Sequence, residues 1–385
     1  MSIKFEEKVL NKIRDVIGDI KVSLHEPIFE GNEIKYLKEC IDTSYVSSIG
    51  PFVKKLERKL SCFTGARYTV ATVNGTCALQ LALIVSGVKK EEEVLIPSLT
   101  FVATANAVIH IGAVPNFLDS ETETLGICPI KLENYLARIS VIRHNQCFNR
   151  LTGRKISAIL PVHVFGHPCK IKDLLEIAKK FKINLVEDAS ESLGSLYMNK
   201  HTGTFGSLGV LSFNGNKIIT SGGGGAILTN NQRYAKMARH LSTTAKVSHS
   251  WNYYHDSIGY NFRMPNINAA LLLAQLEKID EKIQLKRNLF NKYFNNFKNF
   301  EGLKILSEPK NCFSNYWLQT LILDKHKEIY KEKILQLTNK NNIGTRPVWD
   351  IIPTMKPYKK FSSDDLSCSK SLYKKIINLP SNVKF

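Results

Sequence analysis

Residues Ile183 to Asn231 read INLVEDASESLGSLYMNKHTGTFGSLGVLSFNGNKIITSGGGGAILTNN, and this stretch decides the fold. A first apolar run ends at the acidic pair Glu187-Asp188, and a second ends shortly before Lys217. Short apolar runs bounded by turn residues predict buried strands, so each strand ends in an ionisable group. A carboxylate and an amine at the carboxyl ends of neighbouring strands favour a carbonyl cofactor, with one partner for a ring nitrogen and one amine for a Schiff base.

Strands and helices alternate before this stretch. We expect strands at 68–73, 93–96, 114–118 and 156–164, and helices at 76–86, 100–112 and 172–181. Such alternation is typical of an α/β fold with a parallel or mostly parallel sheet covered by helices on both faces. The expected large domain spans residues 25–245.

The pattern changes beyond Arg233. Residues 265–283 predict one long amphipathic helix that continues toward Phe297. Short strands are expected at 303–306 and 317–323, and a lysine-rich helix at 328–338. These elements indicate a smaller C-terminal α+β domain at residues 246–385.

The first 24 residues form a separate N-terminal unit in this division. Apolar residues recur there at helical spacing and predict an amphipathic helix, namely Phe5, Val9, Ile13, Val16 and Ile20. Charged residues interrupt the segment, so it lacks the uncharged core of a signal peptide. No window approaches the roughly 20 apolar residues of a membrane span. We therefore expect a cytoplasmic protein without a membrane partner.

Composition narrows the class further. The chain has 385 residues, 43% of them hydrophobic and 23% charged, and this size and content favour a folded protein of two domains. A formal charge of +19 admits nucleic acid, an anionic membrane or an anionic small molecule as a partner. The lysines are spread without an RNA-binding aromatic motif or zinc-finger spacing, so we expect a solvated basic surface and no nucleic acid partner. The eight cysteines form no CxxC, which predicts reduced thiols and no metal site.

Two further segments carry candidates for holding a phosphorylated cofactor. Gly75 and Thr76 follow a strand and open an apolar helix, whose N–H groups and dipole favour a phosphate. Ser212 precedes Lys217 and offers a hydroxyl, although a serine in a strand is also simply tolerated.

Three residues have both a functional and an ordinary explanation. Phe101 opens a helix, where it either stacks on a flat ring or packs in the core. His163 ends a strand, where it either walls the pocket or is a satisfied core residue. Asp188 either pairs with a pyridinium nitrogen or caps a following helix.

Six blocks occur in an order that one family shares. They are NGTCALQLAL, IPSLTFVATANAVIHIGAVPNFLDSE, PVHVFGHPCKI, VEDASESLGS, GTFGSLGVLSFNGNKIITSGGGGAILTNN and GYNFRMPNINAALLLAQLE. From about Glu26 to its end the chain resembles the pyridoxal phosphate (PLP)-dependent nucleotide-sugar aminotransferases of fold type I, the DegT-like family. This resemblance implies a large domain with a mostly parallel seven-stranded sheet between helices and a smaller C-terminal domain.

The resemblance also implies roles for individual residues. Lys217 would form the Schiff base with the cofactor, and Asp188 would pair with its ring nitrogen. The phosphate would be held by Gly75, Thr76 and Ser212, the ring covered by Phe101, and the phosphate of the neighbouring subunit's cofactor reached by Asn261. An obligate homodimer follows from the role of Asn261.

Two departures from the family pattern accompany these matches. Many relatives carry Gln where this chain has Glu191, so a cofactor contact of Glu191 near the 3-hydroxyl is an open expectation. Many relatives also carry an acidic residue within the glycine stretch at 222–225, which we interpret as variation between branches.

Two more segments resemble one branch of the family. HEPIFEGNEIKYLKECIDTSYVSS and TRPVW are similar to enzymes that aminate C4 of UDP-4-keto-6-deoxy-N-acetylglucosamine, on routes to bacillosamine or legionaminic-acid-type sugars. The implied reaction moves the amine of L-glutamate, through pyridoxamine phosphate, to the 4-ketone of a UDP-linked sugar and leaves 2-oxoglutarate. Substrate contacts are expected from Tyr316, Arg346 and Trp349, each of which could also be a surface cation or a core aromatic.

Other functions stay open at this point. A 3-keto or dTDP-linked sugar is an alternative substrate for the same chemistry. A non-catalytic PLP-binding regulator of the same fold would bind the cofactor without transamination, although such proteins usually add a DNA-binding module. A nucleic-acid-binding protein is indicated only by the charge.

Overall fold

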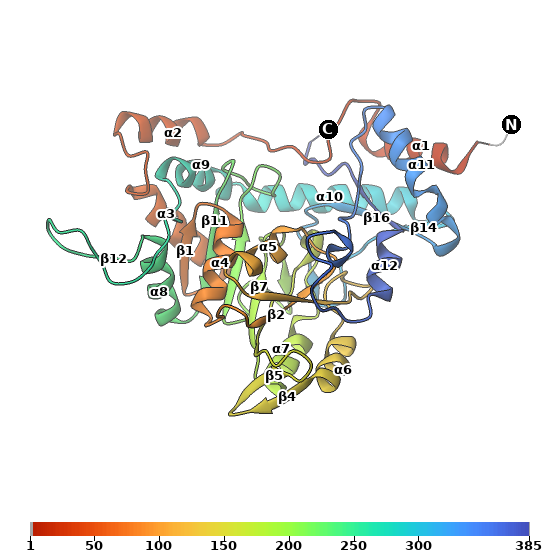
Figure 1. Cartoon of the computed structure of the whole chain (residues 1–385). Helices are drawn as coiled ribbons and strands as arrows, with labels where there is room; N and C mark the ends of the chain where they lie inside the picture. Colours follow the sequence, from red (N-terminus) through yellow and green to blue (C-terminus); the bar gives the residue numbers. More distant parts are fainter. Residues whose placement is uncertain (1–2, 385) are drawn as a thin grey trace.

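A seven-stranded sheet forms the centre of the protein, for which a computed structural model describes residues 3–384. The strands lie in the spatial order β1-β11-β10-β7-β6-β2-β3 (Figure 1). Their bounds are β1 Tyr68–Thr72, β2 Glu93–Pro97, β3 Val114–Leu118, β6 Ile156–Ile159, β7 Asn184–Asp188, β10 Leu208–Ser212 and β11 Gly225–Thr229. β11 runs antiparallel to its two neighbours, and the other pairs are parallel. The expected α/β fold with a mostly parallel seven-stranded sheet is confirmed.

Helices cover both faces of this sheet. One hydrophobic cluster contains residues of α4 Gly75–Val85, α5 Ala103–His110 and α8 Gln232–Ser242, and another contains residues of α6 Pro129–Ile139 and α7 Ile171–Lys180. Alternate residues of β2 divide between them, with Val94 and Ile96 in the first cluster and Leu95 in the second. Because successive side chains of a strand point to opposite faces, both faces are buried, which explains the continuous apolar runs in the sequence.

A second sheet lies in the C-terminal part of the chain, in the order β14-β16-β18-β17 with antiparallel pairs. Its strands are β14 Leu303–Ile305, β16 Gln319–Leu323, β17 Arg346–Pro347 and β18 Ile376–Leu379. Residues of α1 Phe5–Ile17, α10 Ile279–Phe297 and α11 Lys331–Lys340 share one hydrophobic cluster with this sheet. The N-terminal helix thus packs against the C-terminal part of the chain, whereas the division at residues 24 and 245 stays a prediction.

The remaining elements are short strands and further helices. The short strands are β4 Ser140–Arg143, β5 Gln146–Asn149, β8 Leu196–Tyr197, β9 Lys200–His201, β12 Lys246–Val247, β13 Tyr254–His255 and β15 Cys312–Phe313. The remaining helices are α2 Glu33–Asp42, α3 Pro51–Thr64, α9 Asn266–Leu276, α12 Ser367–Tyr373, η1 Val164–Gly166, η2 Lys325–Tyr330 and η3 Ile352–Thr354. The arm with β12 and β13 projects from the end of the molecule that also carries α8 (Figure 1).

Two helix predictions need correction. The N-terminal helix ends at Ile17, because Gly18 adopts a φ of +82°. Ile20, expected on its apolar face, lies beyond the helix and is 43% exposed. The single helix expected from Pro265 to Phe297 is two helices, α9 and α10, separated at Glu277-Lys278. Neither residue is a helix breaker. The two helices pack on different partners, because α9 contacts α2 and α3 whereas α10 contacts α1. Among residues 3–384 no helix is long and apolar enough to cross a membrane.

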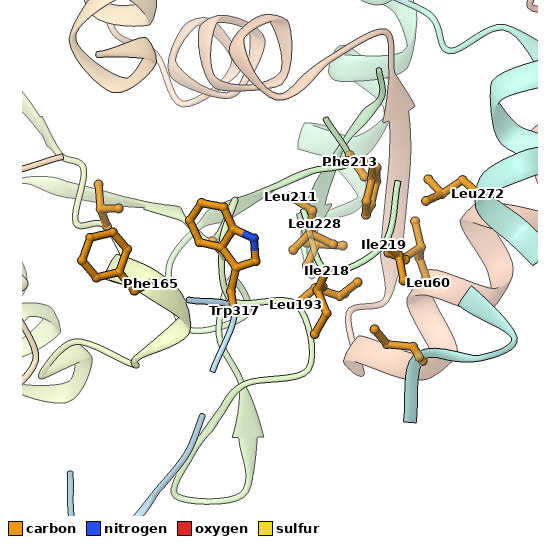
Figure 2. Packing of buried hydrophobic residues seen from close by; sticks show 14 of the residues in the cluster. Leu60, Phe165, Leu193, Leu211, Phe213, Ile218, Ile219, Leu228, Leu272 and Trp317 are labelled. Atoms are coloured by element: carbon orange, nitrogen blue, oxygen red, sulfur yellow. The ribbon is translucent and has the colours of Figure 1, made fainter. Parts of the chain in front are cut away.

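The largest hydrophobic cluster lies where the sheet meets α3 and α9. Figure 2 shows Leu211 and Leu228 of the sheet near Leu60 of α3, with Leu272 of α9 close by. Ile218 and Ile219 belong to the same cluster and are 7% and 1% exposed. These two residues directly follow Lys217, so apolar burial fixes the loop that carries the lysine.

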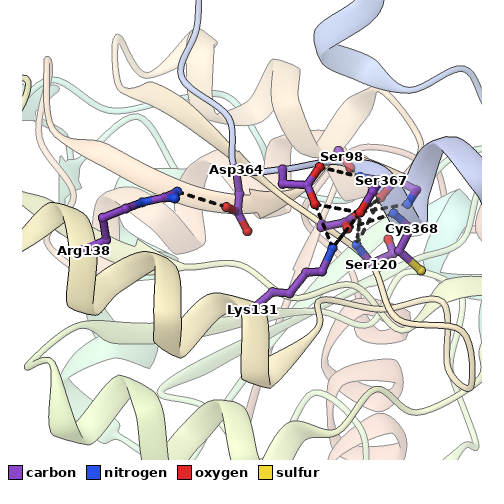
Figure 3. A network of polar contacts seen from close by, with 10 residues as sticks. Ser98, Ser120, Lys131, Arg138, Asp364, Ser367 and Cys368 are labelled. Atoms are coloured by element: carbon purple, nitrogen blue, oxygen red, sulfur yellow. Dashed lines mark hydrogen bonds and ion pairs between the residues drawn. The ribbon is translucent and has the colours of Figure 1, made fainter.

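A polar network connects residues 362–369 to β3 at the edge of the main sheet (Figure 3). The Phe117 N–H donates to the Ser362 carbonyl (2.9 Å), and the Asp364 N–H donates to the Phe117 carbonyl (2.8 Å), so the segment pairs with β3. The buried Asp119 carboxylate then accepts from Lys131 Nζ (2.5 Å) and from the Ser369 N–H (2.8 Å). Although burial raises the pKa of Asp119, these donors hold it below its ordinary value.

Removal of this carboxylate tests the network. We expect Asp119→Ala to lower the free energy of unfolding by about 2–4 kcal/mol, because partly buried donors lose a charged acceptor. Urea denaturation measures the change. Arg138→Gln is the control, because Arg138 is largely exposed in its ion pair with Asp364 (3.3 Å) and such pairs contribute less than about 1 kcal/mol. Equal stability of the two variants would contradict a structural role for Asp119.

Candidate active site

A cavity of about 380 Å³ lies at the carboxyl ends of β7 and β10, beside the start of α4. It brings together eight of the residues expected from the sequence, namely Gly75, Thr76, Phe101, Asp188, Glu191, Ser212, Lys217 and Trp349. The other lining residues are Asn74, Leu79, Thr100, Ala103, Thr104, Val162, Ser190, Asn214, Asn216 and Trp317. Its volume lies in the usual range of small-molecule sites.

Asp188 is the last residue of β7 and is 3% exposed. Its carboxylate accepts from the Thr104 hydroxyl (2.9 Å) and from the Ser190 N–H (3.2 Å). The residues directly after Asp188 are not helical, and the next helix along the chain is α8, so the alternative role of Asp188 as a helix cap is wrong. Two donors thus orient a nearly buried carboxylate at the wall of the cavity, where it can bind a protonated ring nitrogen.

Lys217 lies in the loop after β10, and its side chain is 11% exposed. Its Nζ is 3.3 Å from Glu191 Oε1 and 4.0 Å from the centre of the Trp317 ring. The Trp317 indole N–H donates to the Asn216 carbonyl (2.7 Å), which fixes the ring against the loop. A carboxylate and an aromatic face therefore hold the amine of Lys217 at the cavity wall.

Glu191 is the acid that departs from the family pattern. Its second oxygen accepts from the Phe165 N–H (2.9 Å). Burial raises the pKa of Glu191, although the charge of Lys217 acts in the opposite direction. The structure places Glu191 as the ion-pair partner of Lys217, and its contact with the cofactor stays a prediction.

The start of α4 provides a cradle for an anion. The Asn74 side chain caps the helix by accepting from the Cys77 N–H (2.8 Å), and the first turn contains no acidic residue. A Cβ on Gly75 would lie 2.7 Å from Ser212 Cβ, so a larger side chain does not fit between α4 and β10. The positive end of α4, the Thr76 hydroxyl and the Ser212 hydroxyl therefore meet at one end of the cavity, as a phosphate requires.

Two residues that were expected to contact the cofactor or the substrate do not line the cavity, and in each case a directly adjacent residue does. His163 is buried away from the cavity, where its Nδ1 accepts from the Cys169 N–H (3.1 Å) and its Nε2 donates to Glu187 (3.1 Å). Val162 lines the cavity instead. Tyr316 is stacked on Phe290 (4.0 Å between ring centres), and the lining residue is the next one, Trp317. Tyr316 adopts a φ of +46°, so a local turn of the backbone sets the direction of its side chain, and the pattern of apolar residues in the sequence does not show such a turn.

The two remaining candidates lie elsewhere. Arg346 is exposed and lines a second cavity of about 450 Å³, next to the first. Asn261 is exposed and does not line the cavity of its own chain. Its expected contact with a neighbouring subunit stays a prediction. Among residues 3–384 no cluster of His, Cys, Asp or Glu has the geometry of a metal site.

The residues of the first cavity fit PLP. The start of α4 and Ser212 suit its phosphate, Asp188 its ring nitrogen, and Lys217 its aldehyde. Phe101, 51% exposed, offers an aromatic face to its ring. Thr104, Val162, Asn216 and Trp317 are part of this site without having been expected from the sequence.

Comparison with known proteins gives the class. The DegT/DnrJ/EryC1/StrS aminotransferase family model matches residues 27–385, and the chain belongs to this family. The protein is a PLP-dependent aminotransferase, so the expected enzyme class and cofactor are confirmed.

Individual relatives agree with this assignment. EpsN of Bacillus subtilis (strain 168), which its name places among PLP-dependent aminotransferases, is 35% identical over 94% of this chain and 91% of its own. GDP-perosamine synthase of Escherichia coli O157:H7 is 34% identical over 94% and 93% of the two chains. The crystal structure of a DegT/DnrJ/EryC1/StrS aminotransferase from Brucella abortus is 25% identical, with a TM-score of 0.82 over 91% and 90% of the chains.

The phosphate cradle is open to a direct test. We expect Gly75→Ala to weaken PLP binding by about ten-fold or more, because the new methyl group pushes α4 and Ser212 apart. Titration of the cofactor-free protein with PLP, followed by visible absorbance, measures the affinity. Gly215→Ala is the matched control, because a Cβ there meets nothing within 4 Å. Unchanged PLP affinity of Gly75→Ala would show that the phosphate does not bind at this position.

Proposed function

We propose that this aminotransferase moves the amino group of L-glutamate to the 4-keto carbon of a nucleotide-linked 4-keto-6-deoxy sugar. The observation that carries the proposal is the meeting of Asp188 and Lys217, from neighbouring parallel strands, in one cavity with the cradle at Gly75. PLP, when bound, supplies an electron-withdrawing ring that makes a substrate C–H bond acidic. The residues of the chain supply binding, orientation and proton transfer.

Each of these residues has a defined task in the proposal. Lys217 Nζ is the base that takes the proton from the carbon bearing the amine and returns it to the cofactor side. Asp188, oriented by Thr104 and Ser190, stabilises the protonated ring nitrogen. Glu191 lies beside Lys217 and stabilises its charged form between proton transfers. The Trp317 ring lies against the amine of Lys217 and shields one side of it from water.

The identity of the nucleotide that carries the sugar, and of the carbon that receives the amine, is part of this proposal. The branch resemblance favours UDP and C4, whereas relatives named GDP-perosamine synthase favour a GDP-linked sugar. A dTDP-linked or 3-keto sugar keeps the same chemistry. The large positive charge of the chain favours attraction of any such diphosphate. We place the reaction in the cytoplasm, as expected from the sequence.

We also propose a homodimer with shared sites. Large apolar side chains are exposed on α2 and the loop that follows it and on the arm around β12 and β13, including Ile34, Ile41, Ile49, Trp251, Tyr253 and Ile258. Exposed apolar surface of this extent is typical of an interface. Asn261 lies just beyond the arm, where a partner subunit can bring it to the other cavity.

The reaction is tested in two half steps. The PLP-loaded protein should be yellow, lose its visible band with L-glutamate and release 2-oxoglutarate. GDP-, UDP- or dTDP-linked 4-keto sugars should then restore the band, and mass and NMR identify the aminated sugar. We expect Lys217→Ala to lose at least about 10³-fold in rate, because it removes the proton-transferring amine. Lys200→Ala, at the exposed start of β9, is the control.

Three results would contradict the proposal. Full turnover by Lys217→Ala would exclude Lys217 as the base. Restoration of the band by a 3-keto sugar alone would exclude C4. A loaded protein that keeps its colour with glutamate and every keto sugar would favour the non-catalytic regulator.

Mixing of subunits tests the shared site. Lys217→Ala and Asn261→Ala are each expected to be nearly inactive as homodimers. A mixed dimer has one site with both native residues if Asn261 acts in the partner's cavity, and none if it acts within its own chain. We therefore expect reassociation of the two inactive variants to restore up to about a quarter of wild-type activity, by statistical mixing of shared sites. Absence of any recovery in dimers confirmed to be mixed would contradict the shared site.

A further inference from the structure

The second cavity adjoins the first. Its volume is about 450 Å³, and it shares five lining residues with the cofactor cavity, namely Thr100, Phe101, Asn216, Trp317 and Trp349. Phe101 and Trp349 lie with their ring centres 6.5 Å apart along this shared wall. A ligand that reacts at Lys217 and extends past this shared wall therefore reaches the second cavity.

The lining of the second cavity suits a flat heteroaromatic ring. Three aromatic side chains, Phe101, Trp317 and Trp349, contribute to it, together with apolar residues such as Leu24 and Met355. Aromatic faces bind planar rings by stacking, with little loss of conformational freedom. The polar groups of the lining are few, so they determine which ring is accepted.

Arg346 supplies a positive charge to this cavity. Its Nη1 donates to Asn339 Oδ1 (2.7 Å) and to the Thr345 carbonyl (2.9 Å), both of which are neutral acceptors. Within residues 3–384 it forms no ion pair with a carboxylate. The charge of Arg346 is thus oriented by the protein and left uncompensated, and a planar guanidinium matches the oxygens of a diphosphate.

Asp350 supplies the opposite charge four residues further on. It lines the same cavity and is exposed. An ionised carboxylate only accepts hydrogen bonds, and its two oxygens offer about four lone-pair positions. Because Asp350 is exposed, acceptor positions are accessible to a ligand in the cavity. Guanine presents two adjacent donors, N1–H and N2–H, whereas uracil and thymine present one N–H between two carbonyl oxygens that a carboxylate repels.

From this geometry we propose that the second cavity binds the nucleoside diphosphate part of the substrate, with Arg346 on the diphosphate and Asp350 selecting guanine. The inference rests on the proposed function and sharpens it, because it favours GDP over the UDP expected from the sequence. Trp349 lies between the two cavities and separates the reacting sugar from the base.

Calorimetric titration of the PLP-loaded protein with GDP, UDP and dTDP tests the inference. We expect GDP to bind about ten-fold more tightly than the other two, because a bidentate contact to a base discriminates by about this factor. Asp350→Asn should abolish most of this preference, because an amide donates as well as accepts. Arg346→Gln should weaken all three nucleotides by a similar factor. Asp324→Asn, an exposed acid outside both cavities, is the control and should change nothing.

Other outcomes overturn the inference without touching the aminotransferase reaction. Tighter binding of UDP or dTDP by the wild type would exclude guanine selection, and so would an unchanged preference in Asp350→Asn. If Arg346→Gln raises the glutamate concentration needed to bleach the cofactor and leaves GDP binding intact, Arg346 serves the amino donor. In each of these cases, loss of the visible band with glutamate shows that the proposed aminotransferase reaction persists although the nucleotide assignment is wrong.

Discussion

The parallel pairing of β7 with β10 is the constraint on which the site depends. In this register Val210 lies opposite Asp188, so β10 and the loop after it continue past the carboxylate and carry Ser212 and Lys217 to the same edge. β11 returns antiparallel and pairs with β1, which brings the start of α4 to that edge as well. An acid, an amine and an anion cradle thus meet because β7, β10 and β1 all end at this edge, where β11 begins between β10 and β1.

Buried polar contacts then fix each group in its direction. Asp188 faces the cavity, while Glu187 beside it faces the opposite side of β7 and accepts from the N–H groups of Gly203, Phe205 and Gly206. This second carboxylate holds the turn before β10 and so supports the pairing itself. On the other strand, apolar burial of Ile218 and Ile219 and the ion pair with Glu191 restrain Lys217 from both sides. The rigidity of the site comes from groups that do not react.

The sequence predicts the strands, the acid and the amine because apolar runs and the ionisable groups that end them are local features. It misplaces His163 and Tyr316 because both lie in irregular backbone next to a strand, where tertiary packing sets the direction of each side chain, and the neighbours Val162 and Trp317 line the cavity. The break between α9 and α10 has no local signal, since it reflects packing on different partners. Arg346 is expected as a substrate contact from the sequence, and the structure adds that its segment lines the second cavity together with Phe101, Trp317 and Trp349.

One measurement tests the central claim, that the amine of Lys217 meets the cofactor at the ends of β7 and β10. Borohydride reduction of the PLP-loaded protein converts a reversible link between lysine and cofactor into a permanent one, and peptide mass spectrometry locates it. The structure predicts that the added mass lies on Lys217 and on no other lysine. A label on a different lysine, or no label on a protein that shows the visible band, would contradict this account of the site.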